Sequence, residues 1–398
     1  MSSPTTPSPL GPHERYAPGT TLKIYTHRPP KPFLSHYAGP RPRRDICQGD
    51  DYPDSFDLSA RVDFALHNPP LSTPPCSNPQ EGTLTIIGDL STRDFTDVEN
   101  SGGPHVVTCL FDDEVPCVAK IYDAVDYPLI GFPECDVRPR TAFYRAFSKP
   151  RNEKFKGMMA PTYYGSWTFA LPTHHRKGKK KVRWVRMILM EHLQGSTMQS
   201  LISKAFSATT TGGTVDYYAL LPPEQTRLSI LKQVLEARLK LFWNLEIELD
   251  ILNTDNIFIC QPDNTIRLIS FTGAKVYRHL DPEVEEHQNT LIDERYYSPL
   301  TPAQMKPYVS PFMEYWPGDK DWVGGRGRRY ITNGPFMYWL PQSWVKSKRN
   351  AVEWLIDTFG TEEEMEKYET TLPELQALLE NWEGLEDGPR EKVKKWLR

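Results

Sequence analysis

The chain has 398 residues, of which 38% are hydrophobic and 12% aromatic, so it is long and apolar enough for one large or two modest folded domains. Its 47 lysines and arginines nearly balance 51 aspartates and glutamates, and a net charge of -4 gives no overall reason to expect nucleic acid or a membrane as partner. With no apolar run approaching the roughly 18 residues of a membrane span, no secretory signal and six scattered cysteines, we expect a soluble intracellular protein with reduced thiols, cytoplasmic or nuclear.

Residues 1–81 are rich in proline and serine, with dense proline patches at 28–32 and 68–75. Proline removes backbone donors and favours the extended polyproline conformation. We therefore expect a partly disordered N-terminal extension outside the packed fold. A docking site for a proline-recognising module is the alternative interpretation.

From Gly82 onward the pattern changes to short apolar and β-branched runs. These predict strands at 83–87, 106–111, 115–122, 163–171 and 182–190, with a short helix at 138–147. A long helix at 223–244 with a broad apolar stripe follows, and then a hairpin of 257–260 with 266–269. Helical patterns return at 344–359 and 372–398. Strands followed mostly by helices predict an α+β fold, with a small antiparallel-sheet lobe before a larger helical lobe.

Several short motifs occur in an order that can be compared with known families. A strand ends in Val118-Ala119-Lys120, a later strand ends in Met190-Glu191-His192-Leu193, and after the long helix come Asn253-Thr254-Asp255-Asn256 and Ser270-Phe271-Thr272-Gly273. This order resembles the protein-kinase-like superfamily, and most closely its divergent fungal members. The resemblance implies a two-lobed protein-kinase-like fold, with the N-lobe and hinge at 82–194, the C-lobe at 195–345 and a helical extension at 346–398.

The resemblance also implies which residues would bind a nucleotide. Lys120 matches the lysine that contacts the α- and β-phosphates of ATP. Glu191 and Leu193 match the hinge positions whose backbone faces the adenine. The glycine-rich lid is replaced by residues 88–97, which offer carboxylates where backbone amides should approach phosphates. The helix at 138–147 carries arginines where the family has the glutamate that pairs with the lysine.

The catalytic and metal-binding loops depart from the family pattern. Counting back from Asn256 places Ile251 where the catalytic aspartate should stand, and isoleucine cannot accept a proton. Ser270 occupies the position of the metal-binding aspartate, and a hydroxyl is a poor magnesium ligand. Asn256 is kept and would be a weak metal ligand. Asp250 lies one residue from the catalytic position and could act as the base only if the loop carried a one-residue bulge.

These losses favour a pseudokinase that acts by binding or scaffolding a protein partner. ATP is its expected ligand, bound weakly through Lys120, Glu191, Leu193, Asn256 and Ser270, and a role for Mg²⁺ is left open. An active, atypical ATP-dependent phosphotransferase that uses Asp250 is the first alternative.

A nucleic-acid-associated protein is the second alternative, since seven basic residues lie between Arg176 and Arg186. A run of this kind could also be a nuclear import signal. Its position between two predicted strands favours a solvated hairpin tip instead. Nucleic acid is therefore not the partner that we expect.

Overall fold

The computed structural model describes residues 15–28, 62, 65–66, 78–91, 104–126, 144, 159–174, 180–210, 216–245, 247–249, 254–271, 274–276, 338–346, 350, 354 and 357–359. The chain divides into two compact units, one of 1–193 with 271–291 and the other of 194–270 with 292–398. The expected helix at 372–398 and all of 138–147 except Tyr144, which is helical, lie outside the described residues. Among those residues, no helix is both long and apolar enough to cross a bilayer.

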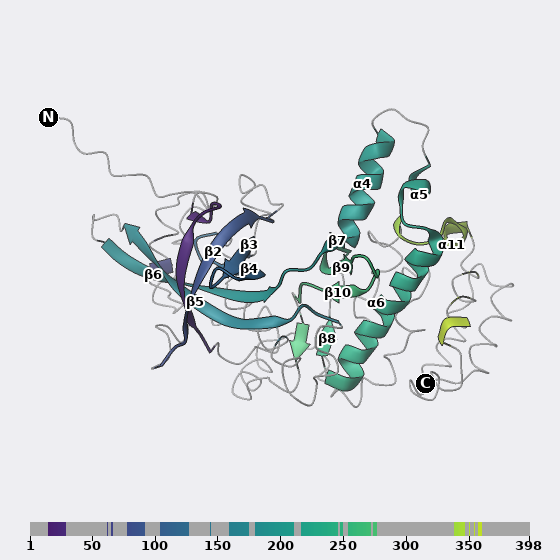
Figure 1. The fold of residues 1–398 in the computed structure, drawn as a ribbon. Coiled ribbons are helices and arrows are strands. Elements are labelled where there is room, and N and C mark those ends of the chain that lie inside the picture. Colours follow the sequence, from purple (N-terminus) through teal and green to yellow (C-terminus); the bar gives the residue numbers. More distant parts are fainter. Residues whose placement is uncertain are drawn as a thin grey trace, which may run out of the picture. The chain divides into compact units, whose positions relative to one another are not determined.

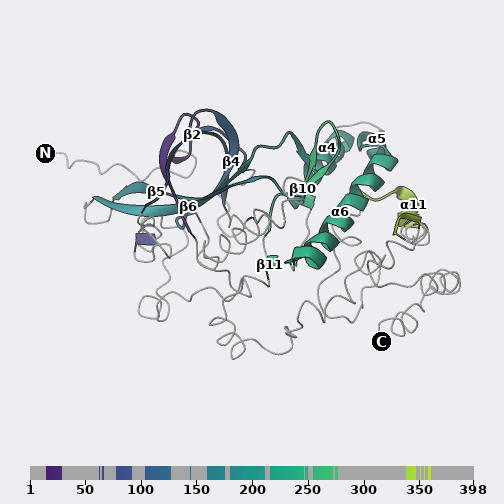
Figure 2. The same ribbon diagram turned by 60° about the horizontal axis from the view of Figure 1, so that its bottom comes forward.

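Six antiparallel strands form a closed barrel in the first unit (Figures 1 and 2). They are β1 (Thr21–Thr26), β2 (Glu81–Asp89), β3 (His105–Phe111), β4 (Val115–Tyr122), β5 (Tyr163–His174) and β6 (Lys180–Glu191), paired in the order β1-β2-β3-β4-β6-β5. In Figure 2, β2 and β4 arch over β5 and β6. Strands β2 to β6 confirm the antiparallel sheet and the strand positions predicted from the sequence.

Strand β1 corrects the expectation that residues 1–81 lie outside the packed fold. It pairs with β2 along one edge and with β5 along the other, and so closes the barrel. The reason is local: Leu22 and Ile24 alternate with Thr21 and Lys23, and the apolar pair is buried while the polar pair is exposed. A six-residue strand is hidden when composition is averaged over a long proline-rich segment.

The barrel interior is filled by side chains that alternate along each strand. The buried cluster consists of Tyr16, Leu22, Ile24, Leu84, Ile86, Val107, Cys109, Cys117, Ala119, Ile121, Trp167, Phe169, Val185, Met187 and Leu189. Because successive residues of a strand point to opposite faces, Lys120 leaves β4 on the outer face, between the interior residues Ala119 and Ile121. The register of the core thus decides where this lysine points.

A buried carboxylate directly after β4 ties three segments together. Asp123 accepts hydrogen bonds from the Tyr16 hydroxyl at 2.7 Å, from the Val125 backbone amide at 3.1 Å and from the Arg183 guanidinium. Burial by itself would raise the pKa of Asp123, but the charges of Arg183 and Arg15 hold it below its ordinary value. This cluster fixes the segment before β1 against the ends of β4 and β6.

The same cluster corrects the expectation that the basic stretch 176–186 is a solvated hairpin tip. Strands β5 and β6 do form a hairpin that pairs as far as His174 with Lys180. However, Arg183 and Arg186 are buried, with 6% and 1% of their surface exposed. Two of the seven basic residues are therefore part of the interior of the first unit and are not available to a nucleic acid.

The second unit is built on a long helix, α6 (Glu224–Leu245), which confirms the helix predicted at 223–244. Helices α4 (Met198–Thr210) and α5 (Tyr217–Leu220) precede it, and a three-stranded sheet is formed by β7 (Gly195–Thr197), β9 (Ile257–Cys260) and β10 (Ile266–Leu268). Strand β8 (Ile247–Leu249) follows α6, and α11 (Gln342–Lys346) lies near the end of the described chain (Figure 1). The first unit also contains a short late strand, β11 (Ala274–Val276).

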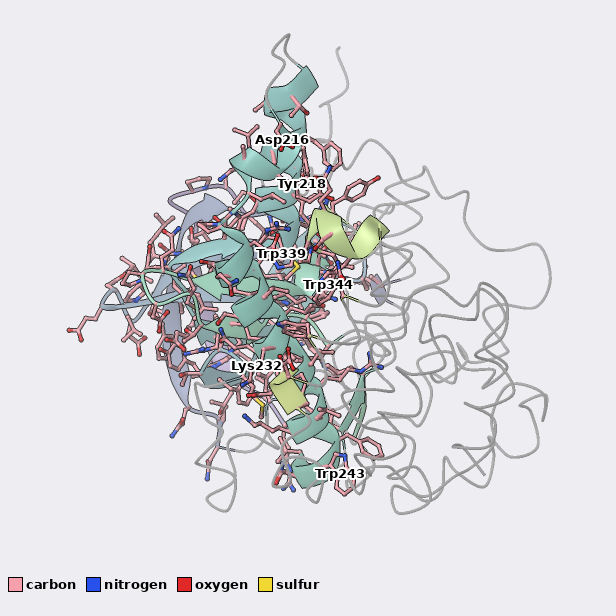
Figure 3. All side chains as sticks on the ribbon, turned by 90° about the vertical axis from the view of Figure 1, so that its right-hand side faces the viewer. Asp216, Tyr218, Lys232, Trp243, Trp339 and Trp344 are labelled. Atoms are coloured by element: carbon pink, nitrogen blue, oxygen red, sulfur yellow. The ribbon has the colours of Figure 1, made fainter. Side chains whose placement is uncertain are left out.

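An arginine on α6 anchors the segment before α11. The buried Arg227 guanidinium donates hydrogen bonds to the carbonyls of Trp339 and Leu340, and the Trp339 indole donates back to the Arg227 carbonyl at 3.1 Å. The guanidinium also lies 5.3 Å from the ring centroid of Tyr218. Figure 3 shows Tyr218, Trp339 and Trp344 toward the same end of α6.

We predict that Asp123→Asn destabilises the first unit strongly. The amide keeps the shape of the side chain but removes the charge that the buried Arg183 guanidinium pairs with, while Arg15 keeps Asp126 as its partner. Loss of one partner of a buried pair costs about 3–5 kcal/mol. Urea unfolding followed by tryptophan fluorescence measures the loss. The matched control is Glu81→Gln, which breaks the exposed 2.8 Å ion pair with Lys23 and should leave the midpoint unchanged. Equal effects of the two substitutions would contradict the role given to Asp123.

A second prediction concerns pH. Burial, together with the negative charge of Asp123, raises the pKa of Asp126 from 3.8 to about 6. The folded protein therefore holds a proton that the unfolded chain has released, and stability falls as pH rises from about 4 to about 6. Between pH 5 and pH 7 this group should remove about 1 kcal/mol of stability, and Asp126→Asn should abolish that part of the slope. Parallel stability curves for the two proteins would show that Asp126 does not titrate in this way.

Candidate functional site

The lysine predicted to contact phosphates lies on a well-defined strand. Lys120 is paired across β4 with Val106 of β3 and with Ile188 of β6. Its side chain is 7% exposed. A lysine at this level of burial is unlike the solvated edge-strand lysine that is the ordinary alternative. Strand β4 therefore holds the Lys120 ammonium group on the outer face of the barrel, where low solvent exposure strengthens its electrostatic interactions.

Glu191, at the predicted hinge position, forms two hydrogen bonds with one neighbour. Its backbone amide donates to the Thr162 carbonyl at 2.9 Å, and its carboxylate accepts from the Thr162 amide at 2.9 Å. Glu191 ends β6, and Leu193 is the last residue of the first unit before Gln194. The end of the hinge strand is thus fixed by its own side chain, a role that the sequence did not reveal.

A glycine begins the second unit's sheet for a steric reason. Gly195 has a φ of 145°, and a Cβ atom there would lie 2.0 Å from the Ile259 carbonyl oxygen. Only glycine allows β7 to approach β9 this closely. The Gln261 amide also donates to the Gln194 carbonyl at 3.0 Å. The segment that follows Leu193 is therefore bound to the hairpin next to Asn256 and Ser270, the two residues at the predicted metal-binding positions.

An aromatic cluster covers the outer face of the first unit near the end of β6. Tyr144 stacks on Tyr163 with ring centroids 5.5 Å apart and meets Phe271 edge-on at 5.2 Å. Its hydroxyl donates to the Met190 sulfur at 3.5 Å. Phe271 is almost fully buried. Phe271, which follows Ser270, thus packs against Tyr144, a residue of the helix predicted at 138–147.

The two metal-position residues share one end of the β9–β10 hairpin in the second unit. Strands β9 and β10 pair Ile257 with Leu268, and the next amide, that of Ile269, donates to the Asn256 carbonyl at 2.9 Å. Asn256 therefore precedes β9 at this end of the hairpin, and Ser270 follows β10 at the same end. The hairpin predicted from the sequence is confirmed, and it brings these two residues to the same end.

The side chains of Gln233 and Thr254 hold that hairpin in place, and neither role was predicted from the sequence. The Gln233 amide on α6 donates to the Asn264 carbonyl at 3.1 Å and accepts from the Ile266 backbone amide at 3.1 Å. The hydroxyl of Thr254 donates to the Gln199 side-chain carbonyl on α4 at 2.6 Å. Thr254 begins the short helix η2 (Thr254–Asn256). Both ends of the hairpin are therefore anchored to helices of the same unit.

The residues that would decide catalysis are only partly described. Asp250 and Ile251 lie outside the described residues, so the register of the catalytic loop stays a prediction. Asp255, which sequence analysis gave no role, stands next to Asn256, and partial burial raises its pKa. Asn256 and Ser270 offer neutral oxygens only. Within the described part of the chain, no three His, Cys, Asp or Glu side chains gather as a metal site, so these residues fit Mg²⁺ poorly.

The end of β2, where a glycine-rich lid would begin, carries an engaged carboxylate. Asp89 accepts from the Ser91 backbone amide at 2.7 Å and lies 3.5 Å from the His105 imidazole. The Ser91 hydroxyl in turn accepts from the Val106 amide at 2.9 Å. The backbone amides of Ser91 and Val106 are therefore already hydrogen-bonded within this turn. A phosphate would meet a carboxylate at this point.

Comparisons with known proteins give a partial likeness. No family model matches the chain, and no curated protein matches it. Among solved structures it is similar to vaccinia related kinase 3, with 16% identity over 50% of this chain and 52% of the other at a TM-score of 0.32. A Toxoplasma gondii specific rhoptry antigen kinase domain gives 16% identity, 48% and 50% coverage and a TM-score of 0.32. The Mycobacterium tuberculosis PknI kinase domain gives 12% identity, 57% and 70% coverage and 0.28.

The chain matches about half the length of the first two of these structures. At such TM-scores the likeness carries no argument about function.

We predict that Phe271→Ala destabilises the first unit. Removing a buried ring that meets Tyr144 leaves a cavity, and such truncations cost about 3–5 kcal/mol. Urea unfolding measures this loss. Tyr144→Phe is the matched control, because it keeps the ring and removes the hydroxyl, whose hydrogen bond to the Met190 sulfur should contribute less than about 1 kcal/mol. A larger effect of the control would mean that the hydroxyl, and not the ring, holds the cluster together.

Proposed function

We propose that this chain is a kinase-like protein that acts by binding and not by phosphoryl transfer. The observation that carries this proposal is the chemistry of two residues that flank the open end of the hairpin: Asn256 and Ser270 supply an amide and a hydroxyl at the positions where the resemblance implies metal ligands. Transfer of a phosphoryl group needs metal ions to neutralise the charge that develops on its oxygens. A site of neutral oxygens holds such ions weakly.

The proposal retains nucleotide binding as a weak property of the first unit. Lys120 supplies a positive charge on a rigid strand, which suits the phosphates of ATP. Glu191 and Leu193 supply backbone groups at the end of the hinge strand, and backbone groups recognise an adenine whatever the side chains are. The Asp89 turn at the end of β2 lowers the affinity, because it sets a carboxylate where a phosphate would lie. Asn256 and Ser270 add little without a bound metal.

The partner of a protein that acts by binding is expected to be another protein. Two of the basic residues that would have served a nucleic acid, Arg183 and Arg186, are instead buried in the first unit. Arg183 is further committed to the Asp123 carboxylate. This arrangement favours the pseudokinase over the nucleic-acid alternative.

A thermal-shift titration with ATP, with and without Mg²⁺, tests the proposal. We expect a Tm rise of a few degrees at about ten times the dissociation constant, the same with or without metal. Lys120→Met should abolish the rise because it removes the phosphate contact. The control is Lys23→Met, which changes an exposed lysine of β1 and should leave the ATP-dependent rise in Tm intact.

Three results would overturn parts of the proposal. A magnesium-dependent shift, together with phosphate transfer that Asp250→Ala abolishes, would establish the active phosphotransferase instead. No shift in either condition would remove nucleotide binding and leave a scaffold only. An equal loss in the Lys120 and Lys23 variants would show that the shift reports surface charge.

A further inference from the structure

Two cysteines face each other inside the barrel of the first unit. Cys109 on β3 and Cys117 on β4 are direct partners in the strand register. Their sulfur atoms are 3.4 Å apart, and each residue is 1% exposed. Both belong to the buried cluster that fills the barrel. The pairing is set by a short turn, since Phe111 pairs with Val115 at the start of the same hairpin.

This placement meets the geometric needs of a disulfide bond. Residues directly opposed in an antiparallel pair have Cα atoms about 4.5–5.5 Å apart, which lies within the roughly 4.4–6.8 Å range of disulfides. The sulfurs need to approach by about 1.4 Å to reach bonding distance. Small rotations of two side chains supply that movement without a change in strand pairing. Reduced cysteines that act only as small apolar residues would explain the burial, but burial alone does not require the two sulfurs to meet.

We propose that Cys109 and Cys117 form a redox site that hydrogen peroxide oxidises to a disulfide within the barrel. In the first step the Cys117 thiolate attacks one peroxide oxygen, the O–O bond breaks, and a sulfenic acid and hydroxide form; the hydroxide takes up the proton that the thiol released. In the second step the Cys109 sulfur attacks the Cys117 sulfur and loses its proton, and the sulfenic oxygen leaves as water. Two thiols are oxidised by two electrons, and one peroxide becomes two waters.

The two thiols are not equivalent, and their difference sets the order of these steps. The hydrogen bond between the two thiols lowers the pKa of Cys117. The same hydrogen bond, together with burial, raises the pKa of Cys109. The thiolate is the nucleophile in such reactions, so Cys117 attacks first and Cys109 resolves the sulfenic acid.

The bond would join the two strands of the hairpin whose second strand, β4, carries Lys120 and ends at Tyr122. It would restrict the openings through which the barrel exposes its interior. A cross-link between residues eight apart also limits the unfolded chain. Oxidation is therefore expected to raise the Tm of the first unit by a few degrees, and a thiol reductant should reverse the rise.

Peptide mapping of the full chain tests the site directly. Trypsin releases residues 94–120 as one peptide, which contains both cysteines and no other. After peroxide treatment of the folded protein, blocking of free thiols and digestion, this peptide should carry no blocking group and be lighter than the reduced peptide by two hydrogen atoms. Cleavage after Asp or Glu then cuts between the cysteines and should give two peptides that separate only on reduction. The Tm is measured on the same samples.

The controls separate this pair from general thiol oxidation. Cys260→Ser removes the half-buried thiol on β9 and should leave the result for residues 94–120 unchanged. Cys117→Ser should abolish both the mass loss and the peroxide-dependent rise in Tm. The proposal is overturned if Cys260 is oxidised while residues 94–120 of the folded wild-type chain keep two free thiols. It is also overturned if either cysteine pairs with one elsewhere in the chain.

Discussion

A single buried carboxylate, that of Asp123, holds the barrel closed. An isolated carboxylate at this depth would be costly, since burial disfavours the charged form by several kcal/mol. Here the cost is offset by hydrogen bonds from Tyr16 and Arg183 and by the nearby charge of Arg15. Two of these three residues precede β1, so the same contacts that satisfy the charge also hold β1 in place. Because β1 pairs with both β2 and β5, it removes the two free edges that the sheet would otherwise present.

Closure of the barrel gives the first unit an apolar interior and an outer face that carries polar side chains such as Lys120. The interior accepts Cys117, Ala119 and Ile121 from β4, and this choice leaves Lys120 on the other side. A shift of one residue in the register would place the lysine in the core and an alanine outside, which makes the register strongly specified. The position of the candidate phosphate-binding lysine is thus a consequence of how the core packs, and needs no separate device.

The sequence predicted those elements whose pattern is local. Strands β2 to β6, helix α6 and the β9–β10 hairpin each carry a period of two or of 3.6 over their own length. Contacts between distant residues left no local trace: Arg183 lies 60 positions from Asp123 and stands in a lysine-rich run that predicts solvent exposure. The same holds for Gln233, whose amide finds two backbone partners in a hairpin some thirty residues away. Strand β1 was missed because its alternation is only six residues long and lies among prolines.

The end of the β9–β10 hairpin in the second unit, where metal ligands were predicted, carries an amide at Asn256 and a hydroxyl at Ser270. Gln233 and Thr254 tie this hairpin to α6 and α4 through side-chain hydrogen bonds, and the Ile269 amide sets Asn256 and Ser270 side by side. These hydrogen bonds fix the shape of the hairpin, but a divalent cation also requires negatively charged ligands. A frame that is held this firmly without the charge suits recognition by shape. This is the physical reason for proposing that the protein acts by binding and not by phosphoryl transfer.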